Sequence, residues 1–423
     1  HNHLAGSVWP EWWYAVATDP QRNGNQRFFT RTKILNCGGC GMEWRGKNID
    51  TVYFVTIREA TWEKLEPCCQ PEFTPLDELT SEQLDAWMSA IKLDQPGEGR
   101  DEFFELTWLR LNELLLDAHV IPEILVENMK AFGAEGLIYL EYQAPSFGMR
   151  DPDGSLVEPE DMALRYEERL ARADAKATGV EVRFLNTVLR FADDAEDRVR
   201  QMYAFLDAHR DRWVGINMAG REDNDKGYPL RFLDTYREMR RKYSGIGISI
   251  HAGEVDEPNA HVRDTLLLGA TRIGHAVNLI SDPDTMLLMR QGQYLVEINL
   301  VSNQLLEYTP DVTLHPFPEY LRFGIPVCLN TDDRGMWYSN MTDEYYTAVT
   351  TFDLTWNEVV QLGRNSLTHS FLQPEAKAER LTLYERNVAA FEERFRADDV
   401  LNTLSKTSGS VSGYASDTWG FEL

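Results

Sequence analysis

Short apolar runs rich in β-branched and aromatic residues recur along the chain between residues 137 and 331. Seven of them have the length and composition of buried strands: Leu137–Tyr142, Val180–Arg190, Trp213–Met218, Gly247–His251, Arg272–Val277, Tyr294–Leu300 and Val327–Thr331. The segments between them include four with helical spacing of apolar residues: Asp194–Arg210, Leu230–Lys242, His261–Leu268 and Asp282–Arg290. Strands that alternate with helices predict parallel pairing, in a doubly wound sheet or in a barrel.

The start of the chain favours the barrel. If the segment that runs into His1 is the end of another strand, the strand count becomes eight, which is the number in a (β/α)8 barrel. We therefore predict an α/β fold, a (β/α)8 TIM-type barrel with an N-terminal insertion or cap and extra C-terminal helices. In this division, residues 1–17 hold the end of the first strand, 18–100 the insertion, 101–400 the rest of the barrel with its outer helices, and 401–423 a C-terminal tail.

The segment Thr18–Arg100 does not follow the alternating pattern. It contains the glycine-rich run Cys37–Gly41, one plausible strand at Thr51–Ile57 and the proline-rich stretch Pro67–Pro75, and it precedes a predicted helix at Asp101–His119. We expect it to form the insertion or cap. After Thr331 the pattern predicts outer and C-terminal helices at Asp343–Phe352, Trp356–Phe371 and Pro374–Arg396, and the Ser-, Gly- and Thr-rich stretch Ser405–Ser416 is expected to be mobile unless something covers it.

Composition narrows the class of partner. The chain has 423 residues, 43% of them hydrophobic, and a net charge of −26. Such a charge repels the phosphates of a long nucleic acid, so a small molecule is the expected partner. No apolar run is long enough to span a membrane and no secretory leader opens the sequence, which predicts a soluble, cytoplasmic protein.

The cysteines are expected to be reduced. Five cysteines are an odd number in a long chain, which argues against a secreted disulfide framework. Cys37 and Cys40 together with Cys68 and Cys69 could chelate a structural zinc ion, but adjacent cysteines suit a tetrahedral site poorly, and free thiols in a cap are the preferred interpretation.

Ionisable residues follow the apolar strands in four short motifs. These are His1-Asn2-His3, His251-Ala252-Gly253-Glu254, Gly274-His275 and Asp332-Asp333. Catalytic groups of a barrel enzyme lie at the C-terminal ends of its strands, so this position supports a functional role.

Two imidazoles at positions 1 and 3 of an extended segment point to the same side of the chain. Adding His251 and the carboxylate of Asp332 completes a three-histidine, one-aspartate set that suits Zn²⁺, one ion per chain. Two adjacent carboxylates at the end of a buried strand are costly without a cation or a donor nearby. The remaining histidines, in helical or loop contexts, are interpreted as structural residues: His119, His209, His261, His315 and His369.

Together these motifs resemble the adenosine deaminase family of metal-dependent hydrolases. The resemblance covers His1–Ser7 and most of the chain from Leu137 to about Leu372, and the motifs occur in the family's order. Its further pieces are Ala219-Gly220 after a strand, Arg272-Ile273-Gly274-His275, Glu297 with Ser302-Asn303, and Asn330-Thr331-Asp332-Asp333.

The resemblance implies a role for each matched residue. His1, His3, His251 and Asp332 would hold the metal, and a water activated by that ion would attack C6 of a purine. Glu254 would protonate ring N1 as general acid, and His275 would orient the attacking oxygen and stabilise its charge. Asp333 would bind N7, and the backbone N–H of Gly220 would approach N3. Ser302 and Asn303 are further candidates for substrate binding.

Two departures from the family pattern leave the identity of the purine substrate open. Ala5 stands where nucleoside deaminases carry an acidic residue for the ribose 5′-hydroxyl. The opening and the run Asp332-Asp333-Arg334-Gly335 look closer to the branch that handles N6-methyl-AMP. Arg221 and Arg334 follow site residues directly, so they could reach a 5′-phosphate from the rim, or they are solvated surface arginines.

Several alternatives stay open from the residues alone. Within enzymes they are an N6-methyl-AMP, AMP or adenine deaminase, or a related hydrolase acting on another ring or on a phosphoester. A non-catalytic barrel scaffold in a larger assembly, a copper site on a free N-terminal His1 and a homo-oligomer were also considered. A cytidine-type deaminase is excluded, because its H-x-E and P-C-x-x-C motifs are absent.

Overall fold

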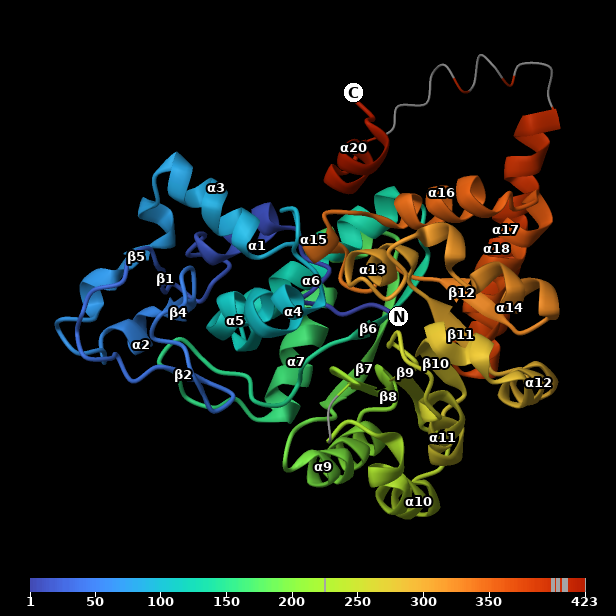
Figure 1. Ribbon diagram of the computed structural model, residues 1–423, viewed down its shortest axis with the longest axis horizontal. Helices are drawn as coiled ribbons and strands as arrows, with labels where there is room; N and C mark the ends of the chain where they lie inside the picture. The colour runs from blue at the N-terminus through green and yellow to red at the C-terminus, as the bar shows by residue number, and fades with distance from the viewer. Residues whose placement is uncertain (224–225, 397–399, 401–403, 405–409, 423) are drawn as a thin grey trace.

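The computed structural model describes residues 1–223, 226–396, 400, 404 and 410–422. Its centre is a parallel sheet with the strand order β12-β11-β10-β9-β8-β7-β6, so each strand pairs with the next one along the chain (Figure 1). The strands are β6 (Tyr139–Gln143), β7 (Glu181–Leu189), β8 (Trp213–Ala219), β9 (Gly247–Ala252), β10 (Arg272–His275), β11 (Leu295–Ile298) and β12 (Val327–Leu329). All seven predicted strands are therefore confirmed, within a few residues at their ends.

The chain's first residues close this sheet into a barrel. Asn2 forms a parallel bridge with Asp332, just after β12, and His3 forms one with Gln143 at the end of β6. The backbone N–H of Leu4 donates to the carbonyl of Gln143 at 3.0 Å, and that of His3 donates to the carbonyl of Asp332 at 3.3 Å. The opening residues thus take the place of the eighth strand, and the predicted TIM-type barrel is confirmed.

Helices follow the strands and cover the barrel (Figure 1). Up to β12 they are α7 (Pro159–Leu170), α8 (Ala173–Ala177), α9 (Ala195–Ala208), α10 (Leu233–Lys242), α11 (His261–Leu268), α12 (Pro283–Gly292), α13 (Leu300–Leu305) and α14 (Phe317–Phe323). After β12 come α15 (Arg334–Trp337), α16 (Met341–Phe352), α17 (Trp356–Thr368), α18 (Pro374–Arg396) and α20 (Gly413–Trp419). Short 3-10 turns connect several of them: η5 (Pro229–Phe232), η6 (Val277–Ser281) and η7 (Val312–Leu314).

The single helix predicted at Asp101–His119 is wrong. The structure divides this stretch into α4 (Arg100–Glu102), the π-helical turn η3 (Phe103–Thr107), α5 (Trp108–Leu111) and the 3-10 turn η4 (Asn112–Leu116). The break follows from tertiary contacts that local propensity does not contain, since the guanidinium and backbone N–H of buried Arg58 both bind Glu113. The long helix that covers the start of the barrel is instead α6 (Val120–Ala134).

The residues between α1 (Pro10–Ala17) and α4 build a separate small sheet beside the barrel, on the left of Figure 1. Its antiparallel order is β4-β1-β5, with β1 (Phe28–Arg31), β4 (Thr56–Arg58) and β5 (Phe73–Pro75). Smaller elements are the hairpin β2 (Glu43–Trp44) with β3 (Lys47–Asn48), α2 (Glu59–Trp62), η1 (Gln70–Glu72), η2 (Leu76–Glu78) and α3 (Ser81–Ala90). Phe29, Ile57 and Phe73 are part of a second apolar core for this segment.

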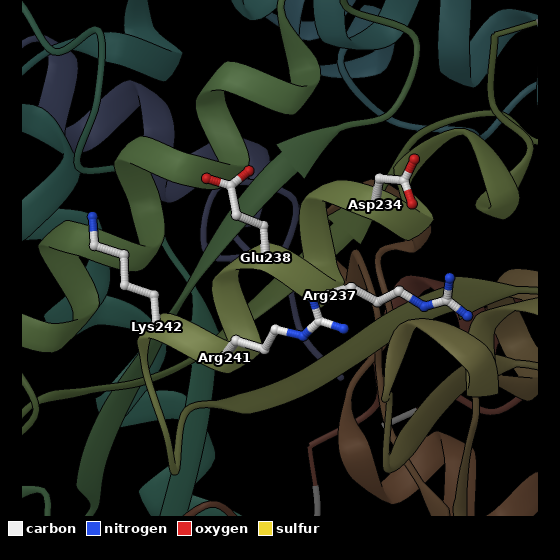
Figure 2. A pocket seen from close by; sticks show the side chains of 5 residues that line it. All are labelled: Asp234, Arg237, Glu238, Arg241 and Lys242. Atoms are coloured by element: carbon white, nitrogen blue, oxygen red, sulfur yellow. The ribbon is translucent and has the colours of Figure 1, made fainter.

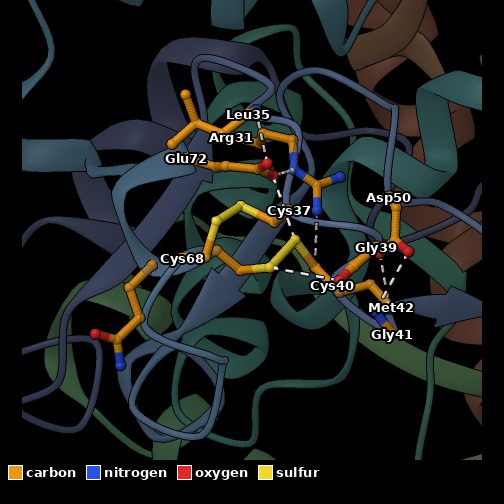
Figure 3. Close-up of a disulfide and its surroundings, with 12 residues drawn as sticks. Arg31, Leu35, Cys37, Gly39, Cys40, Gly41, Met42, Asp50, Cys68 and Glu72 are labelled. Atoms are coloured by element: carbon orange, nitrogen blue, oxygen red, sulfur yellow. Dashed lines mark hydrogen bonds and ion pairs between the residues drawn. A yellow bond between two sulfur atoms is a disulfide. The ribbon is translucent and has the colours of Figure 1, made fainter.

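The expectation of reduced cysteines is wrong. Cys37 forms a disulfide with Cys68 (Figure 3). Cys40 forms a second one with Cys69, so two disulfides join the two cysteine-containing segments. Buried Arg31 and Glu72 form an ion pair of 3.0 Å beside them. Only Cys328 is free, and it is buried. The sequence separates the paired cysteines by 31 and 29 residues, and such spacing does not specify connectivity.

Reduction of these disulfides is expected to destabilise the insertion. Closing a loop of this length stabilises a fold by about 4 kcal/mol through the entropy of the unfolded chain. Urea unfolding with and without a reductant measures the change, and Cys328→Ser, which removes only the free thiol, serves as the control. Alkylation of all five cysteines in the unfolded, unreduced protein would contradict the pairing.

The C-terminal helices pack on the outside of the barrel. In the described part of the tail, Ser412 Oγ donates to Asp343 at 2.6 Å and Tyr414 OH donates to Gln304 Oε1 at 2.7 Å, so α20 is held against the barrel. Residues 401–403, 405–409 and 423 of the predicted tail lie outside the described residues. Among the described helices, none combines the length and the apolar character needed to cross a membrane.

Candidate active site

Four predicted metal ligands meet where the strands end. His1 and His3 come from the first strand position, His251 from the end of β9, and Asp332 follows β12. His3 Nε2 lies 3.1 Å from His251 Nε2, and Asp332 Oδ1 lies 3.3 Å from the Nε2 atoms of both His1 and His3. His1 and His3 are more than 300 positions from Asp332 in the sequence, and barrel closure brings them together.

This donor set fits a tetrahedral cation. Ligand atoms about 2.1 Å from a zinc ion would lie about 3.4 Å from one another, close to the three spacings of 3.1 to 3.3 Å given above. Ligand atoms of His1, His251, His275 and Asp332 all lie within 4.8 Å of one another, and His3 forms a second such group with Asp332 and Asp333. His1 Nε2 and Asp332 Oδ1 are buried without a hydrogen-bond partner in the described protein, which is costly unless something else binds them. His275 Nε2 also lies near this group.

The electrostatics of the set agree with a bound cation. Burial opposes a charge on His1, but the neighbouring carboxylates of Asp332 and Glu297 outweigh it and raise the His1 pKa to about 10. Burial raises the pKa of Asp332, yet contacts with His1 and His3 hold it well below its usual value. The site therefore favours a carboxylate facing a positive charge, carried by a proton on His1 when no metal is bound.

Glu297 orients the first of these ligands. Its carboxylate lies 2.9 Å from His1 Nδ1, accepts from Ser249 Oγ at 3.0 Å and pairs with Arg272 Nε at 2.7 Å. Burial acts against its charge, but Arg272 and His1 lower the Glu297 pKa to about 2. A carboxylate on Nδ1 leaves His1 Nε2 for the ion, as is common behind metal-binding histidines.

Glu254 and His275 lie beside the candidate metal ligands. His275 Nε2 is 3.7 Å from Glu254 Oε2 and 3.8 Å from Asp332 Oδ2. Burial, followed by the charges of Asp332 and Glu222, raises the pKa of Glu254 well above its usual value. Burial lowers the pKa of His275 to about 3. A protonated carboxylic acid and a neutral imidazole thus face the same space.

Asp333 and Gly220 are the two residues predicted to hold a purine ring. Asp333 is 3% exposed, and its Oδ1 has no hydrogen-bond partner among the described residues. Burial and the neighbouring charges of Asp332 and Glu254 raise the pKa of Asp333 well above its usual value. Gly220 has φ +104°, and a Cβ there would lie 2.8 Å from the ring of Phe191, so only glycine fits.

Ser302 and Asn303 are fully buried beneath the site. Ser302 Oγ donates to Asp332 Oδ2 at 2.8 Å. Asn303 Nδ2 lies 2.9 Å from His275 Nδ1. Both side chains therefore contact other site residues, and their contact with substrate stays a prediction.

The two arginines considered for a phosphate differ in position. Arg334 is 1% exposed, pairs with Glu135 at 2.7 Å and lies 3.8 Å over the ring of Phe132, so it is neither at the rim nor solvated, and both expectations for it are wrong. Arg221 is partly exposed, and its guanidinium binds both Asp101 and Asp223 at 2.7 Å.

The segment that begins at α4 crosses the ends of several strands. Arg100 pairs with Asp256, which follows β9, at 2.6 Å, and Asp101 pairs with Arg221, which follows β8. The ring of Phe103 lies 5.0 Å from that of Trp337, in α15 after β12. This segment therefore forms one wall of the space over the site.

The sequence analysis missed a group of buried residues that binds the end of β9 and the residues after it. Glu222, fully buried, accepts from the backbone N–H groups of Gly253 and Glu254 at 3.1 and 2.9 Å. His261, interpreted from the sequence as a structural residue, places its Nδ1 2.7 Å from the same carboxylate. Arg190 donates to the carbonyl of His251. The available signal was that Arg190 ends one predicted strand and Glu222 follows another.

A surface hollow on helix α10 is unrelated to these residues (Figure 2). It is lined by Asp234, Arg237, Glu238, Arg241 and Lys242. All five come from one outer helix, and their charges are mixed, so they do not form a converging binding site.

Comparisons with known proteins agree with this arrangement. A family model described as adenosine deaminase matches residues 79–385. The adenosine deaminase of Plasmodium falciparum is 27% identical over 296 residues, which are 69% of this chain and 77% of that protein. The match to the family model begins at residue 79, inside the insertion. The motif His1-Asn2-His3 therefore lies before the matched residues, on the other side of the insertion.

Two solved structures share the fold. The adenine deaminase of Arthrobacter aurescens superposes with a TM-score of 0.65 at 19% identity, covering 92% of this chain and 98% of that one. The N6-mAMP deaminase of Arabidopsis also gives a TM-score of 0.65, at 20% identity, covering 91% of this chain and 96% of that one.

Proposed function

Because the chain belongs to the adenosine deaminase family, whose members are metal-dependent hydrolases, we propose that it removes the 6-amino group of adenosine. The products are the 6-oxo purine nucleoside and ammonia. The observation that carries this proposal is the position of His3 Nε2, which lies 3.1 Å from His251 Nε2 and 3.3 Å from Asp332 Oδ1, near Glu254 and His275.

One zinc ion per chain is the proposed cofactor. His1, His3, His251 and Asp332 would hold it, since they combine three imidazoles with one carboxylate. When bound, such an ion acidifies water and so supplies the nucleophile for hydrolysis near neutral pH. Glu297 keeps His1 Nε2 directed at the ion through its contact with Nδ1.

The protein's own groups then move and hold protons at the purine. Burial raises the pKa of Glu254 and so favours its protonated acid, which can give its proton to ring N1 as C6 is attacked. His275 is neutral and stands between Glu254 and Asp332, where it can donate a hydrogen bond to the attacking oxygen. Water supplies two protons: one restores Glu254, and the other passes from the attacking oxygen to the 6-amino nitrogen. The C6–N bond then breaks, ammonia leaves and the 6-oxo group forms.

Asp333 and Gly220 hold the ring. Asp333 is proposed to donate a hydrogen bond to N7, which requires the protonated acid that its raised pKa provides. The absence of a side chain at Gly220 allows its backbone N–H to approach N3.

A nucleoside is the preferred substrate over a nucleotide. Arg334 is buried on Glu135, and the charge of Arg221 is compensated by Asp101 and Asp223. Neither of the arginines considered for a 5′-phosphate therefore offers an uncompensated charge. The relatives named above act on adenosine, adenine and N6-mAMP, which share the substituted C6 of the purine.

A substrate panel tests this choice. We expect kcat/KM for adenosine to exceed that for AMP, N6-methyl-AMP and adenine by at least about tenfold, the effect of one lost or unmatched contact. Ammonia release measures each rate under identical metal loading. If AMP or N6-methyl-AMP is preferred, and Arg221→Met removes that preference while adenosine turnover is unchanged, the nucleotide alternative is correct.

The compartment is proposed from the disulfides. Bonds of this kind persist in oxidising compartments and are rare in the cytosol. The pairs Cys37–Cys68 and Cys40–Cys69 therefore favour an oxidising environment over the cytoplasmic location that composition suggested.

A further inference from the structure

The proton on His275 can be assigned from its surroundings. Its Nδ1 faces two side-chain amides, with Asn303 Nδ2 at 2.9 Å and Asn299 Nδ2 at 3.3 Å. Its Nε2 is buried, has no hydrogen-bond partner among the described residues, and faces the site. Which nitrogen carries the proton depends on whether the amides donate to Nδ1 or accept from it.

The hydrogen bonds of a second histidine, His315, determine how these amides are oriented. The backbone N–H of Phe317 donates to His315 Nδ1 at 3.1 Å, and a backbone N–H can only donate. Burial lowers the His315 pKa to about 3, so the ring is neutral and its one proton lies on Nε2. Turning the ring over would put carbon atoms at both contacts, so this orientation is fixed.

The next link follows from the first. His315 Nε2 donates to Asn303 Oδ1 at 3.1 Å, which identifies the oxygen of that amide and leaves its NH2 group facing His275. Asn299 has the same orientation, since its Nδ2 donates to the carbonyl of Glu297 at 3.3 Å. His275 Nδ1 therefore accepts hydrogen bonds and carries no proton.

We propose that His315 and Asn303 are positioning residues that hold His275 as the Nε2–H tautomer, with its proton directed into the active site. This series of hydrogen bonds runs from the start of α14, through α13, to the end of β10. Phe317, His315, Asn303 and His275 are all buried. His275 is thereby restricted to donating a hydrogen bond, and it cannot act as a base toward the attacking water.

The tautomer can be observed in the resting protein. Histidine-selective ¹⁵N labelling of the zinc-loaded enzyme should show the ring proton of His275 on Nε2 and that of His315 on Nε2 as well. The signals are assigned by their loss in His275→Asn and His315→Phe. A proton on His275 Nδ1 would overturn the proposal, and this measurement does not depend on the proposed deaminase activity.

The substitution Asn303→Asp replaces the amide that donates to His275 Nδ1 with a carboxylate of nearly the same shape. A carboxylate accepts a hydrogen bond, so the proton should move to His275 Nδ1 and leave a lone pair facing the site. We expect kcat for adenosine to fall by about 10² to 10⁴-fold, as for other enzymes whose histidine is held in the wrong tautomer, with KM and zinc content nearly unchanged.

Asn365→Asp is the matched control, because Asn365 is also a buried amide and donates to the carbonyl of Val327 at 2.9 Å, outside this chain of contacts. Its kcat should stay near that of the native protein. This kinetic test rests on the proposed function. An unchanged kcat in Asn303→Asp contradicts the positioning role, whereas a native protein with no deaminase activity contradicts the proposed function and leaves the spectroscopic test standing.

Discussion

Replacing Glu254 with glutamine is expected to lower kcat by about 10³-fold, because the amide cannot transfer a proton to N1 of the purine. Glutamine has nearly the same shape and also lacks a charge, so it should preserve the buried environment that raises the pKa of Glu254. Steady-state ammonia release gives kcat, and atomic emission gives the zinc content, which should match that of the native protein.

Glu257→Gln is the control for this substitution, since Glu257 lies in the same loop but is exposed. It should keep the native rate. A Glu254→Gln enzyme with undiminished kcat would refute the role of general acid. If neither the native protein nor any variant releases ammonia from a purine, while zinc is fully bound, the scaffold alternative gains support.

Replacing Asp332 with asparagine is expected to abolish both zinc retention and turnover. Asp332 is the only carboxylate in the proposed ligand set, and its contacts with His1 and His3 are 3.3 Å each. Changes to groups that merely support metal ligands cost about 10 to 100-fold in affinity, so loss of a charged ligand should exceed that. Zinc per chain after dialysis measures the effect.

Thermal unfolding gives a second readout for Asp332. A ligand present at 1,000 times its dissociation constant stabilises the native state by about 4 kcal/mol. Added zinc should therefore raise the Tm of the chelator-treated native protein and leave that of Asp332→Asn almost unchanged. Asp234→Asn, on the exposed face of α10, should respond like the native protein. Full zinc occupancy in Asp332→Asn would show that the ion binds elsewhere.

The parallel strands were predictable because each has an apolar run bounded by polar residues. β8, β9 and β10 begin at the predicted residues Trp213, Gly247 and Arg272. Their burial on both faces makes the pattern strong and local. The predicted helix at Asp101–His119 failed for the opposite reason, since contacts with a distant residue, Arg58, outweigh the local preference.

The candidate site was predictable as a set of residue types and not as a geometry. Histidine and aspartate after buried strands indicated a metal, because such groups are costly there without one. Arg334 shows the limit of this reasoning. It follows Asp333 in sequence, yet its side chain is buried against Glu135 and Phe132.

The amino-acid sequence alone indicated the alternation of strands and helices, the barrel expected from it and the residue types at the strand ends, since hydrophobic spacing and side-chain type are local properties. Only the tertiary structure decided how cysteines 37, 40, 68 and 69 pair, which arginine stays near the surface, and which nitrogen of His275 carries its proton. Each of these depends on contacts between residues distant in the chain, as in the links from Phe317 through His315 and Asn303, and no local pattern encodes them.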